Sequence, residues 1–274
     1  MLEKLLLCVG AQKAGTSWLH NMLTRSPDIK FSRLKEIHYL DMRAGLNNQL
    51  PQHLLAAVAR QFGLPKDSFL ARLPGGEKAA LHSIKSILDD QWYFDQFGQH
   101  QGYCADFTPE YALLSAADLK ATQRLAKQRK AIFIMRDPVE RSLSAFRYYH
   151  QNRDIDVGQM SNRKIKSLLN SRLFAGRSDY PSVIAKLSQS FNPEDVLYLF
   201  YEDVMTEKRA AIESVCEFLD IELFDLGEER LNKKINTSAP LSFDEEIYTF
   251  LGKKYDQDKE RIRIELGHIP EQWA

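Results

Sequence analysis

The chain has 274 residues, a length that suits one large domain or two small ones. Its 37 basic and 37 acidic residues cancel, so no polybasic signature points to a nucleic-acid partner or a membrane surface, and any anion must be bound by local groups. Its three cysteines, Cys8, Cys104 and Cys216, are widely spaced and match no metal-binding or disulfide pattern.

The apolar runs of the sequence are short. None approaches the roughly 20 residues of a membrane-spanning helix, and Leu5–Val9 is too brief for the core of a secretory signal. Cys8 and Cys104 lie in apolar, strand-like surroundings, as buried thiols do in a reducing compartment. We therefore expect a soluble, cytoplasmic protein with no membrane span, and the sequence carries no signal for an oligomeric state.

The N-terminal stretch predicts an anion site. Leu5–Val9 is apolar and predicts a buried strand, Gly10–Gly15 forms a turn that contains Lys13, and Thr16 opens an amphipathic helix. A helix N-terminus attracts anions because its first N–H groups and the positive end of its dipole converge there. The cation of Lys13 and the hydroxyls of Thr16 and Ser17 complete a predicted phosphate site.

This turn differs from a Walker A loop, in which a lysine directly follows the second glycine. Gly10 and Gly15 have the right separation, but Lys13 lies between them and Thr16 follows Gly15. The lysine therefore leaves from inside the loop rather than from the helix. Taken alone, the turn is equally compatible with an ordinary strand-turn-helix that carries a solvated lysine.

The next segments alternate between strand and helix patterns. Apolar residues at helical spacing carry the first helix to about Leu23, and residues 29–31 predict a short strand. Charged and apolar residues alternate in 35–41. Residues 44–90 have a helical tendency that prolines interrupt, and we expect this segment to be variable and to face the substrate.

Residues 102–135 contain two further strands. Residues 102–106 predict a core strand that ends in a turn at 107–109, and residues 112–129 predict a helix with a polar, basic end. The continuous apolar run 131–135 is typical of a central parallel strand that is covered on both faces.

A second strand-to-helix junction follows this apolar run. Asp137 is a predicted N-cap, Pro138 takes the first helical position, and Glu140 is placed to close a capping box. Arg136 lies directly before this helix, and Ser144 lies on its face. One ligand with two separated anionic groups would explain both junctions.

The rest of the chain continues the alternation. Residues 152–178 are polar and basic and predict a mobile excursion or lid that faces the substrate. A helix is expected at 181–187 and a strand at 196–201. Glu202 and Asp203 then lead into a long amphipathic helix that ends near 219, and a final helix follows. The sequence thus predicts an α/β fold with a P-loop-like central parallel sheet flanked by helices, in a single domain over residues 1–274.

The two junctions resemble the binding sites of sulfotransferases that use 3′-phosphoadenosine 5′-phosphosulfate (PAPS). Tyr201–Val204 and the closing Pro270-x-x-Trp273 resemble that family too, so the resemblance spans nearly the whole chain. The resemblance implies a phosphosulfate site formed by Gln12, Lys13, Ala14, Gly15, Thr16, Ser17 and Trp18, and a 3′-phosphate site formed by Arg136 and Ser144. It also implies that Lys13 stabilises the departing 5′-phosphate, so that no metal is needed.

Residues 35–41 resemble an element of the bacterial and heparan-sulfate-type branch of this family. By that resemblance Glu36 is the general base that takes the proton of the acceptor, on the side of the sulfur opposite Lys13. His38 would orient the acceptor or share the proton, and Asp41 would fix the imidazole. Either Glu36 or His38 could serve as the base. Without the resemblance, the segment would be interpreted as a solvated charged strand or a buried structural histidine.

One departure from the family pattern concerns the acceptor. Heparan-type members carry a lysine before a Ser/Thr-Pro-x-x-Tyr turn, whereas Phe107 stands before Thr108 here. Together with the balanced charge, this disfavours a polyanionic glycosaminoglycan. A glycan of neutral charge, a lipid, or a small or carrier-bound metabolite is the expected acceptor.

Two alternatives belong to other functional classes. An ATP-dependent small-molecule kinase would carry a lysine after Gly15 and an acidic Mg²⁺ ligand at a strand end, and Asp137 as an N-cap is a poor candidate for that ligand. A catalytically inactive nucleotide-binding module would not need Lys13, Glu36 and His38 together. The sequence therefore favours a PAPS-dependent sulfotransferase.

Overall fold

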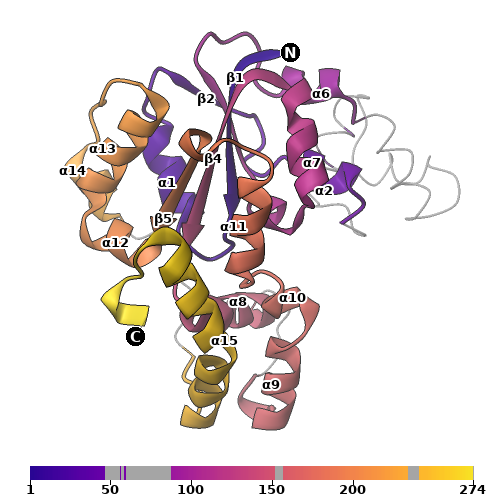
Figure 1. Cartoon of the computed structure of the whole chain (residues 1–274), viewed down its shortest axis with the longest axis vertical. Helices are drawn as coiled ribbons and strands as arrows, with labels where there is room; N and C mark the ends of the chain where they lie inside the picture. Colours follow the sequence, from indigo (N-terminus) through magenta and orange to yellow (C-terminus); the bar gives the residue numbers. More distant parts are fainter. Residues whose placement is uncertain (47–55, 57–58, 60–87, 152–156, 234–240, 274) are drawn as a thin grey trace, which may run out of the picture.

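A five-stranded parallel sheet of order β2-β3-β1-β4-β5 forms the centre of the computed structural model (Figure 1). The strands are β1 (Leu2–Gly10), β2 (Ile29–Phe31), β3 (Tyr103–Phe107), β4 (Ala126–Met135) and β5 (Val196–Phe200). The structure describes residues 1–46, 56, 59, 88–151, 157–233 and 241–273. The predicted α/β class with a central parallel sheet is confirmed.

The interior strands carry the two apolar runs that the sequence singles out. Residues 5–9 of β1 are completely buried, and residues 131–135 of β4 are at most 1% exposed. Continuous apolar sequence is required there because helices cover both faces of the sheet. β1 lies between β3 and β4, and the connection after β1 and the connection after β3 run across the sheet in opposite directions. Ligands of such sheets bind at the carboxyl ends of the strands beside β1.

Helices flank the sheet on two sides (Figure 1). One group consists of α1 (Thr16–Leu23), α12 (Tyr201–Thr206), α13 (Lys208–Leu219) and α14 (Glu228–Asn232). The other consists of α2 (Tyr39–Arg43), α6 (Asp90–Asp95), α7 (Ala116–Ala121) and α11 (Tyr180–Ser188). Short 3₁₀ turns lie at Pro109–Leu113, Thr122–Arg124, Val157–Gln159, Pro193–Asp195 and Glu271–Trp273.

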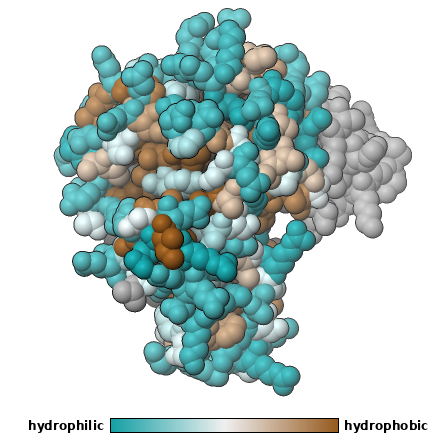
Figure 2. Space-filling view, in the orientation of Figure 1, coloured by the Kyte–Doolittle hydropathy of each residue, from teal (hydrophilic) through white to brown (hydrophobic). Residues whose placement is uncertain are grey.

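A third helical layer lies beyond the carboxyl ends of the strands, at the bottom of Figure 1. It consists of α8 (Pro138–Gln151), α9 (Asn162–Leu169), α10 (Arg172–Ala175) and α15 (Glu245–Leu266). Phe146, Leu169, Phe174 and Leu251 share a second apolar cluster within it. The outer surface of this layer is mainly hydrophilic in the face drawn in Figure 2.

The segment 152–178 differs from the predicted mobile excursion. Residues 152–156 lie outside the described part, but 157–178 form helices that pack against α8 and α15 and bury Ile165, Leu169 and Phe174. The polar residues that suggested a lid occupy the outer faces of these helices. Most of the predicted substrate-facing segment 44–90 also lies outside the described residues.

One helix boundary predicted from the sequence is wrong. The helix predicted at 112–129 is the short α7, and residues 126–130 already belong to β4, where Arg129 pairs with Leu5 of β1. Backbone pairing with the sheet outweighs the polar composition of this half-strand. The helix predicted after Glu202 and Asp203 is α13, which ends at Leu219 as expected; the short α12 precedes it, and the backbone leaves the helical conformation at Glu207 between them.

Within the described residues, no helix combines the length and the apolar character that a membrane crossing requires. Cys8, Cys104 and Cys216 are buried free thiols, as predicted for the first two.

Candidate active site

The loop between β1 and α1 is a tight turn that depends on positive backbone angles. Gly10, Lys13 and Gly15 have φ angles of 147°, 70° and 92°. A Cβ atom on Gly15 would lie 2.9 Å from the ring of Tyr201, so only glycine fits. The turn places the start of α1 at the carboxyl end of β1, where the first-turn N–H groups of a helix have no intrahelical acceptor.

The other residues of this loop fix its shape. Ala14, Thr16 and Trp18 are buried, and Trp18 Nε1 donates to the carbonyl oxygen of Leu231 over 3.4 Å. These contacts hold the loop against α14. The predicted strand, turn and helix are therefore confirmed as a local structure.

Lys13 lies within this loop, between Gly10 and Gly15. Its ammonium is 4.5 Å from the centre of the Tyr148 ring, which is half exposed on α8. Burial lowers the pKa of Lys13, and the positive charges of Arg136 and Lys35 lower it further. Lys13, Arg136 and Lys35 repel one another near the N-terminus of α1. A bound anion would therefore be stabilised there.

Arg136, at the end of β4, meets the same loop. Its Nη1 donates to the carbonyl oxygen of Lys13 over 3.4 Å, and its guanidinium lies 4.9 Å from the centre of the Tyr201 ring. Its buried Nε has no hydrogen-bond partner among the described residues. A buried donor without an acceptor is costly, so it marks a place where a ligand oxygen can bind. Ser144 is buried further along α8.

The start of α8 is capped differently from the prediction. Asp137 is the N-cap, since its Oδ1 accepts bonds from the backbone N–H groups of Val139 and Glu140 at 2.8 and 3.0 Å. The predicted capping box is not formed, because the backbone N–H of Asp137 donates to Glu202 Oε1 instead, and Glu140 lies 3.6 Å from Arg136. Glu202 of α12 thus accepts the bond that the capping box would have given to Glu140.

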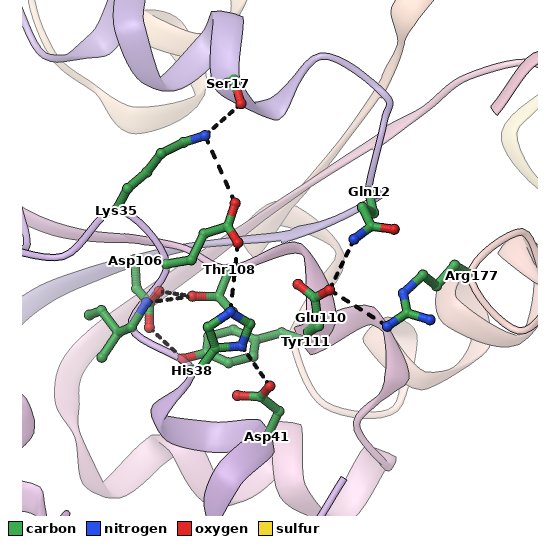
Figure 3. A network of polar contacts seen from close by, with 12 residues as sticks. Gln12, Ser17, Lys35, His38, Asp41, Asp106, Thr108, Glu110, Tyr111 and Arg177 are labelled. Atoms are coloured by element: carbon green, nitrogen blue, oxygen red, sulfur yellow. Dashed lines mark hydrogen bonds and ion pairs between the residues drawn. The ribbon is translucent and has the colours of Figure 1, made fainter. Parts of the chain in front are cut away.

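The segment after β2 lies beside the first turn of α1 (Figure 3). Lys35 Nζ donates to Ser17 Oγ over 2.6 Å and lies 3.8 Å from Glu36 Oε1. The structure therefore brings Glu36 beside the first turn of α1, although 18 residues separate Lys35 from Ser17. The alternation of charged and apolar residues does not form a strand here.

His38 is held between two carboxylates. Its Nδ1 lies 2.8 Å from Asp41 Oδ2, which confirms the predicted contact, and its Nε2 lies 3.6 Å from Glu36 Oε2. Burial alone would lower the pKa of His38, but the bonds to Asp41 and Glu36 outweigh it and raise the pKa to about 10. His38 is therefore a cation at neutral pH.

The turn after β3 holds the backbone of the segment that carries Glu36 and His38. Thr108 Oγ1 accepts a 3.1 Å bond from the backbone N–H of Ile37 and donates over 2.7 Å to Asp106, to which Tyr111 also donates. Asp106 is fully buried, and burial raises its pKa to about 6. This network fixes the backbone from which Glu36 and His38 project.

Glu110 belongs to the same site, although its sequence pattern does not predict this. Its Oε1 accepts a 3.2 Å bond from Gln12 and lies 3.6 Å from Arg177, while its buried Oε2 has no hydrogen-bond partner in the described part of the chain. Burial raises the pKa of Glu110, although His38 and Arg177 oppose this. The only signal in the sequence was its place in the turn Thr108-Pro109-Glu110-Tyr111.

Glu36, His38 and Glu110 also have the proximity that a metal ion needs. One potential ligand atom from each lies within 4.8 Å of the others. A metal would have to displace a proton from His38, whose raised pKa favours the cation. The arrangement is satisfied more simply by a protonated imidazole between carboxylates.

The comparison with known families decides what this site belongs to. A model of the sulfotransferase family matches residues 6–225. The chain belongs to the sulfotransferase family. It is therefore an enzyme of the transferase class, as the two junctions led us to expect.

Solved structures of sulfotransferases share the fold of this chain. A sulfotransferase from Alicyclobacillus acidocaldarius is 18% identical, with a TM-score of 0.70 over 100% of this chain and 99% of that chain. The sulfotransferase domain of the curacin biosynthetic pathway is 16% identical, with a TM-score of 0.54 over 98% and 99% of the two chains. The sulfotransferase domain of the Synechococcus PCC 7002 olefin synthase is 17% identical, with a TM-score of 0.51 over 84% and 76%.

No curated protein sequence matches this sulfotransferase. At these identities the structural likeness establishes the fold alone. The roles of individual residues must therefore be argued from the geometry of the site.

Proposed function

We propose that this sulfotransferase transfers the sulfuryl group of PAPS to an acceptor hydroxyl, less readily to an amine, and releases adenosine 3′,5′-bisphosphate. The observation that carries the proposal is the contact between Arg136 and the backbone of Lys13, which joins the two anion-attracting junctions into one site. A nucleotide with separated 5′ and 3′ anionic groups suits that arrangement better than a linear triphosphate. The chain would act as a single sulfotransferase domain in the cytoplasm.

Lys13 and the start of α1 would bind the 5′-phosphosulfate. As the sulfur leaves, negative charge grows on the bridging oxygen of the phosphate. Lys13, with its lowered pKa and half-buried position, becomes a stronger partner when an anion arrives, because the anion offsets the repulsion from Arg136 and Lys35. Such placed charges supply most of the catalysis in group transfer, where the protein does little covalent work.

Arg136 and Ser144 would hold the 3′-phosphate. The Nε of Arg136 is a buried donor with no acceptor in the described residues, and Tyr201 supports the plane of its guanidinium. A phosphate oxygen would satisfy this donor and form a charge-assisted bond. This interaction would give the site its preference for PAPS over ATP.

Glu36 would act as the general base. The acceptor oxygen attacks the sulfur, the bond between sulfur and the phosphate oxygen breaks, and the acceptor proton passes to Glu36. His38 is unsuited to accept this proton because its pKa of about 10 keeps it protonated. We assign it the role of orienting Glu36, from which it lies 3.6 Å, and the acceptor.

The acceptor is proposed to be a glycan, a lipid, or a small or carrier-bound metabolite. Phe107 at the lysine position of heparan-type members and the balanced charge argue against a polyanion. Residues 44–90, which we expect to contribute to its recognition, lie largely outside the described part. The buried Oε2 of Glu110 has no hydrogen-bond partner among the described residues, which suits a ligand that donates a hydrogen bond (Figure 3).

Transfer of radioactive sulfur tests this function without knowledge of the acceptor. PAPS labelled with ³⁵S is incubated with the protein and with separate lipid, glycan and small-metabolite extracts, and labelled products are separated by chromatography. Wild-type protein should label a component of at least one extract. Glu36→Gln should label none while it binds adenosine 3′,5′-bisphosphate as tightly as wild type. Full labelling by Glu36→Gln would remove Glu36 as the base.

A further inference from the structure

Trp273 lies in the C-terminal 3₁₀ turn but packs deep in the structure. Its side chain is 1% exposed, and its ring contacts Phe200 at the end of β5, with ring centres 5.2 Å apart, and Tyr180 on α11, with ring centres 6.3 Å apart. A buried indole normally finds an acceptor for its N–H group. The identity of that acceptor connects this distant segment to the site.

The indole N–H binds the carboxylate that caps α8. Trp273 Nε1 donates to Glu202 Oε2 over 2.8 Å, and the backbone N–H of Asp137 donates to Oε1 of the same side chain over 3.0 Å. One carboxylate therefore links Trp273 to the residue that follows Arg136. Both oxygens of Glu202 are engaged, so Glu202 is held on the cap of α8.

Lys259 of α15 links Trp273 to Asp137 by a second route. Its Nζ donates to the carbonyl oxygen of Trp273 over 2.5 Å and lies 2.8 Å from Asp137 Oδ2. Asp137 Oδ1 is already bound to the first turn of α8. Every polar atom of the Asp137 side chain thus has a partner, and two paths join it to Trp273.

Both the backbone and the guanidinium of Arg136 contact residues beside the network of Trp273, Glu202 and Asp137. The Tyr180 hydroxyl donates to its carbonyl oxygen over 2.9 Å, and Tyr180 packs against Trp273. Its guanidinium lies over Tyr201, the residue before Glu202. Trp273 thus contacts Tyr180, which holds the backbone of Arg136, and Glu202, the neighbour of the ring that supports the Arg136 guanidinium.

We infer that Trp273 is a positioning residue for the 3′-phosphate site, acting on Arg136 through Glu202 and Asp137. This inference rests on the proposed function, because it assumes that Arg136 binds the 3′-phosphate. Trp273 itself touches no reacting group. Loss of its N–H group removes the partner of Glu202 Oε2. The carboxylate that accepts from the Asp137 backbone through Oε1 is then fixed at one oxygen only, so Asp137 and the neighbouring Arg136 are held less firmly.

The test compares two nucleotides that differ only in the 3′-phosphate. Dissociation constants for adenosine 3′,5′-bisphosphate and for AMP are measured by calorimetry on wild type and on Trp273→Phe, which keeps an aromatic ring and removes the N–H group. We expect the constant for the bisphosphate to rise about tenfold, the value of one charge-assisted bond. The constant for AMP should be unchanged. Arg136→Ala should abolish the difference between the two nucleotides.

A second variant guards against loss of the fold. Glu202→Gln keeps the size of the side chain but presents an amide donor to one of its two donor partners, so it should reproduce the selective loss. Arg263→Ala, an exposed residue one turn after Lys259 on α15, and Trp92→Phe, a buried tryptophan on α6, are the controls and should bind both nucleotides as wild type does.

The outcomes separate this inference from the proposed function. If Arg136→Ala loses the 3′-phosphate preference while folded Trp273→Phe and Glu202→Gln keep it, the positioning role is overturned and the 3′-phosphate site stands. If Arg136→Ala keeps the preference, the site assignment fails and the inference fails with it. An equal weakening of both nucleotides in Trp273→Phe would also overturn the inference, because it would indicate a general structural role.

Discussion

Lys35 Nζ donates a hydrogen bond to Ser17 Oγ over 2.6 Å, and this contact joins the segment that carries Glu36 to the first turn of α1. Lys35 also lies 3.8 Å from Glu36 Oε1. The side that would hold the nucleotide and the side that would hold the acceptor therefore share one cation. The sequence motif drew attention to Glu36 and His38, but the structure adds Lys35 as their link to the phosphate loop.

Lys35→Ala should weaken nucleotide binding. Its side chain is 42% exposed, so we expect a modest increase of about tenfold or less in the dissociation constant of adenosine 3′,5′-bisphosphate, measured by calorimetry. The increase should shrink as salt is added, because the interaction is with an exposed charge. Lys30→Ala, which removes an exposed lysine on β2, is the matched control. Equal affinity in Lys35→Ala and wild type would contradict the link.

Gly15→Ala should disrupt the phosphate loop. The added Cβ would meet the Tyr201 ring at 2.9 Å in a backbone conformation with a φ of 92°, which costs about 1–3 kcal/mol of stability. Gly252→Ala on α15 is the control, since nothing lies within 4 Å of its Cβ position and it should gain about 0.5–1 kcal/mol from helix propensity. Chemical denaturation measures both. A neutral Gly15→Ala would show that the loop does not need glycine there.

The raised pKa of His38 predicts how stability changes with pH. The pKa is about 10 in the folded protein against 6.5 ordinarily, so the folded state holds a proton that the unfolded state has released between these values. The stabilisation is complete below pH 6.5 and is lost as the pH rises through 10, on the order of 1.4 kcal/mol per pH unit. His38→Gln should lack this slope in denaturation measured from pH 6.5 to 9.5. Parallel curves for the two proteins would refute the charged His38.

Glu110→Gln should stabilise the protein at neutral pH. Burial raises the pKa of Glu110, so its ionised form costs folding energy above that pKa despite the contact with Arg177. We expect a melting temperature a few degrees higher at pH 7, since about 1 kcal/mol corresponds to roughly 2–4 °C for a chain of this size. The difference should disappear below pH 4.5, where Glu110 is protonated in both states.

The control for this prediction is Glu246, whose pKa is shifted in the opposite direction. Lys166 lowers the pKa of the exposed Glu246, so Glu246→Gln should leave the melting temperature unchanged or lower it slightly at pH 7. A lower melting temperature for Glu110→Gln than for wild type at pH 7 would mean that Arg177 outweighs burial.

Local signals in the sequence were enough to predict the elements that form the site. The apolar run of β1, the glycines at 10 and 15, and the proline after Asp137 each act within a few residues, so the strand, the loop and the helix start were predictable. The family resemblance then supplied the segment with Glu36 and His38. These features need no knowledge of which strands are neighbours.

The contacts that the sequence did not predict join segments far apart in the chain. Glu202 replaces Glu140 in capping α8 because β5 lies beside β4, and Gln12 meets Glu110 because β1 lies beside β3. The polar start of β4 resembled the end of a helix until its pairing with β1 was known. Each of these depends on the sheet order rather than on local pattern.

Calorimetric titration of wild-type protein with adenosine 3′,5′-bisphosphate and with ATP and Mg²⁺ tests the central claim most directly. The two junctions that meet at Lys13 and Arg136 should bind the bisphosphate at least tenfold more tightly than ATP with Mg²⁺. Tighter binding of ATP with Mg²⁺ would contradict the assignment of these junctions to PAPS.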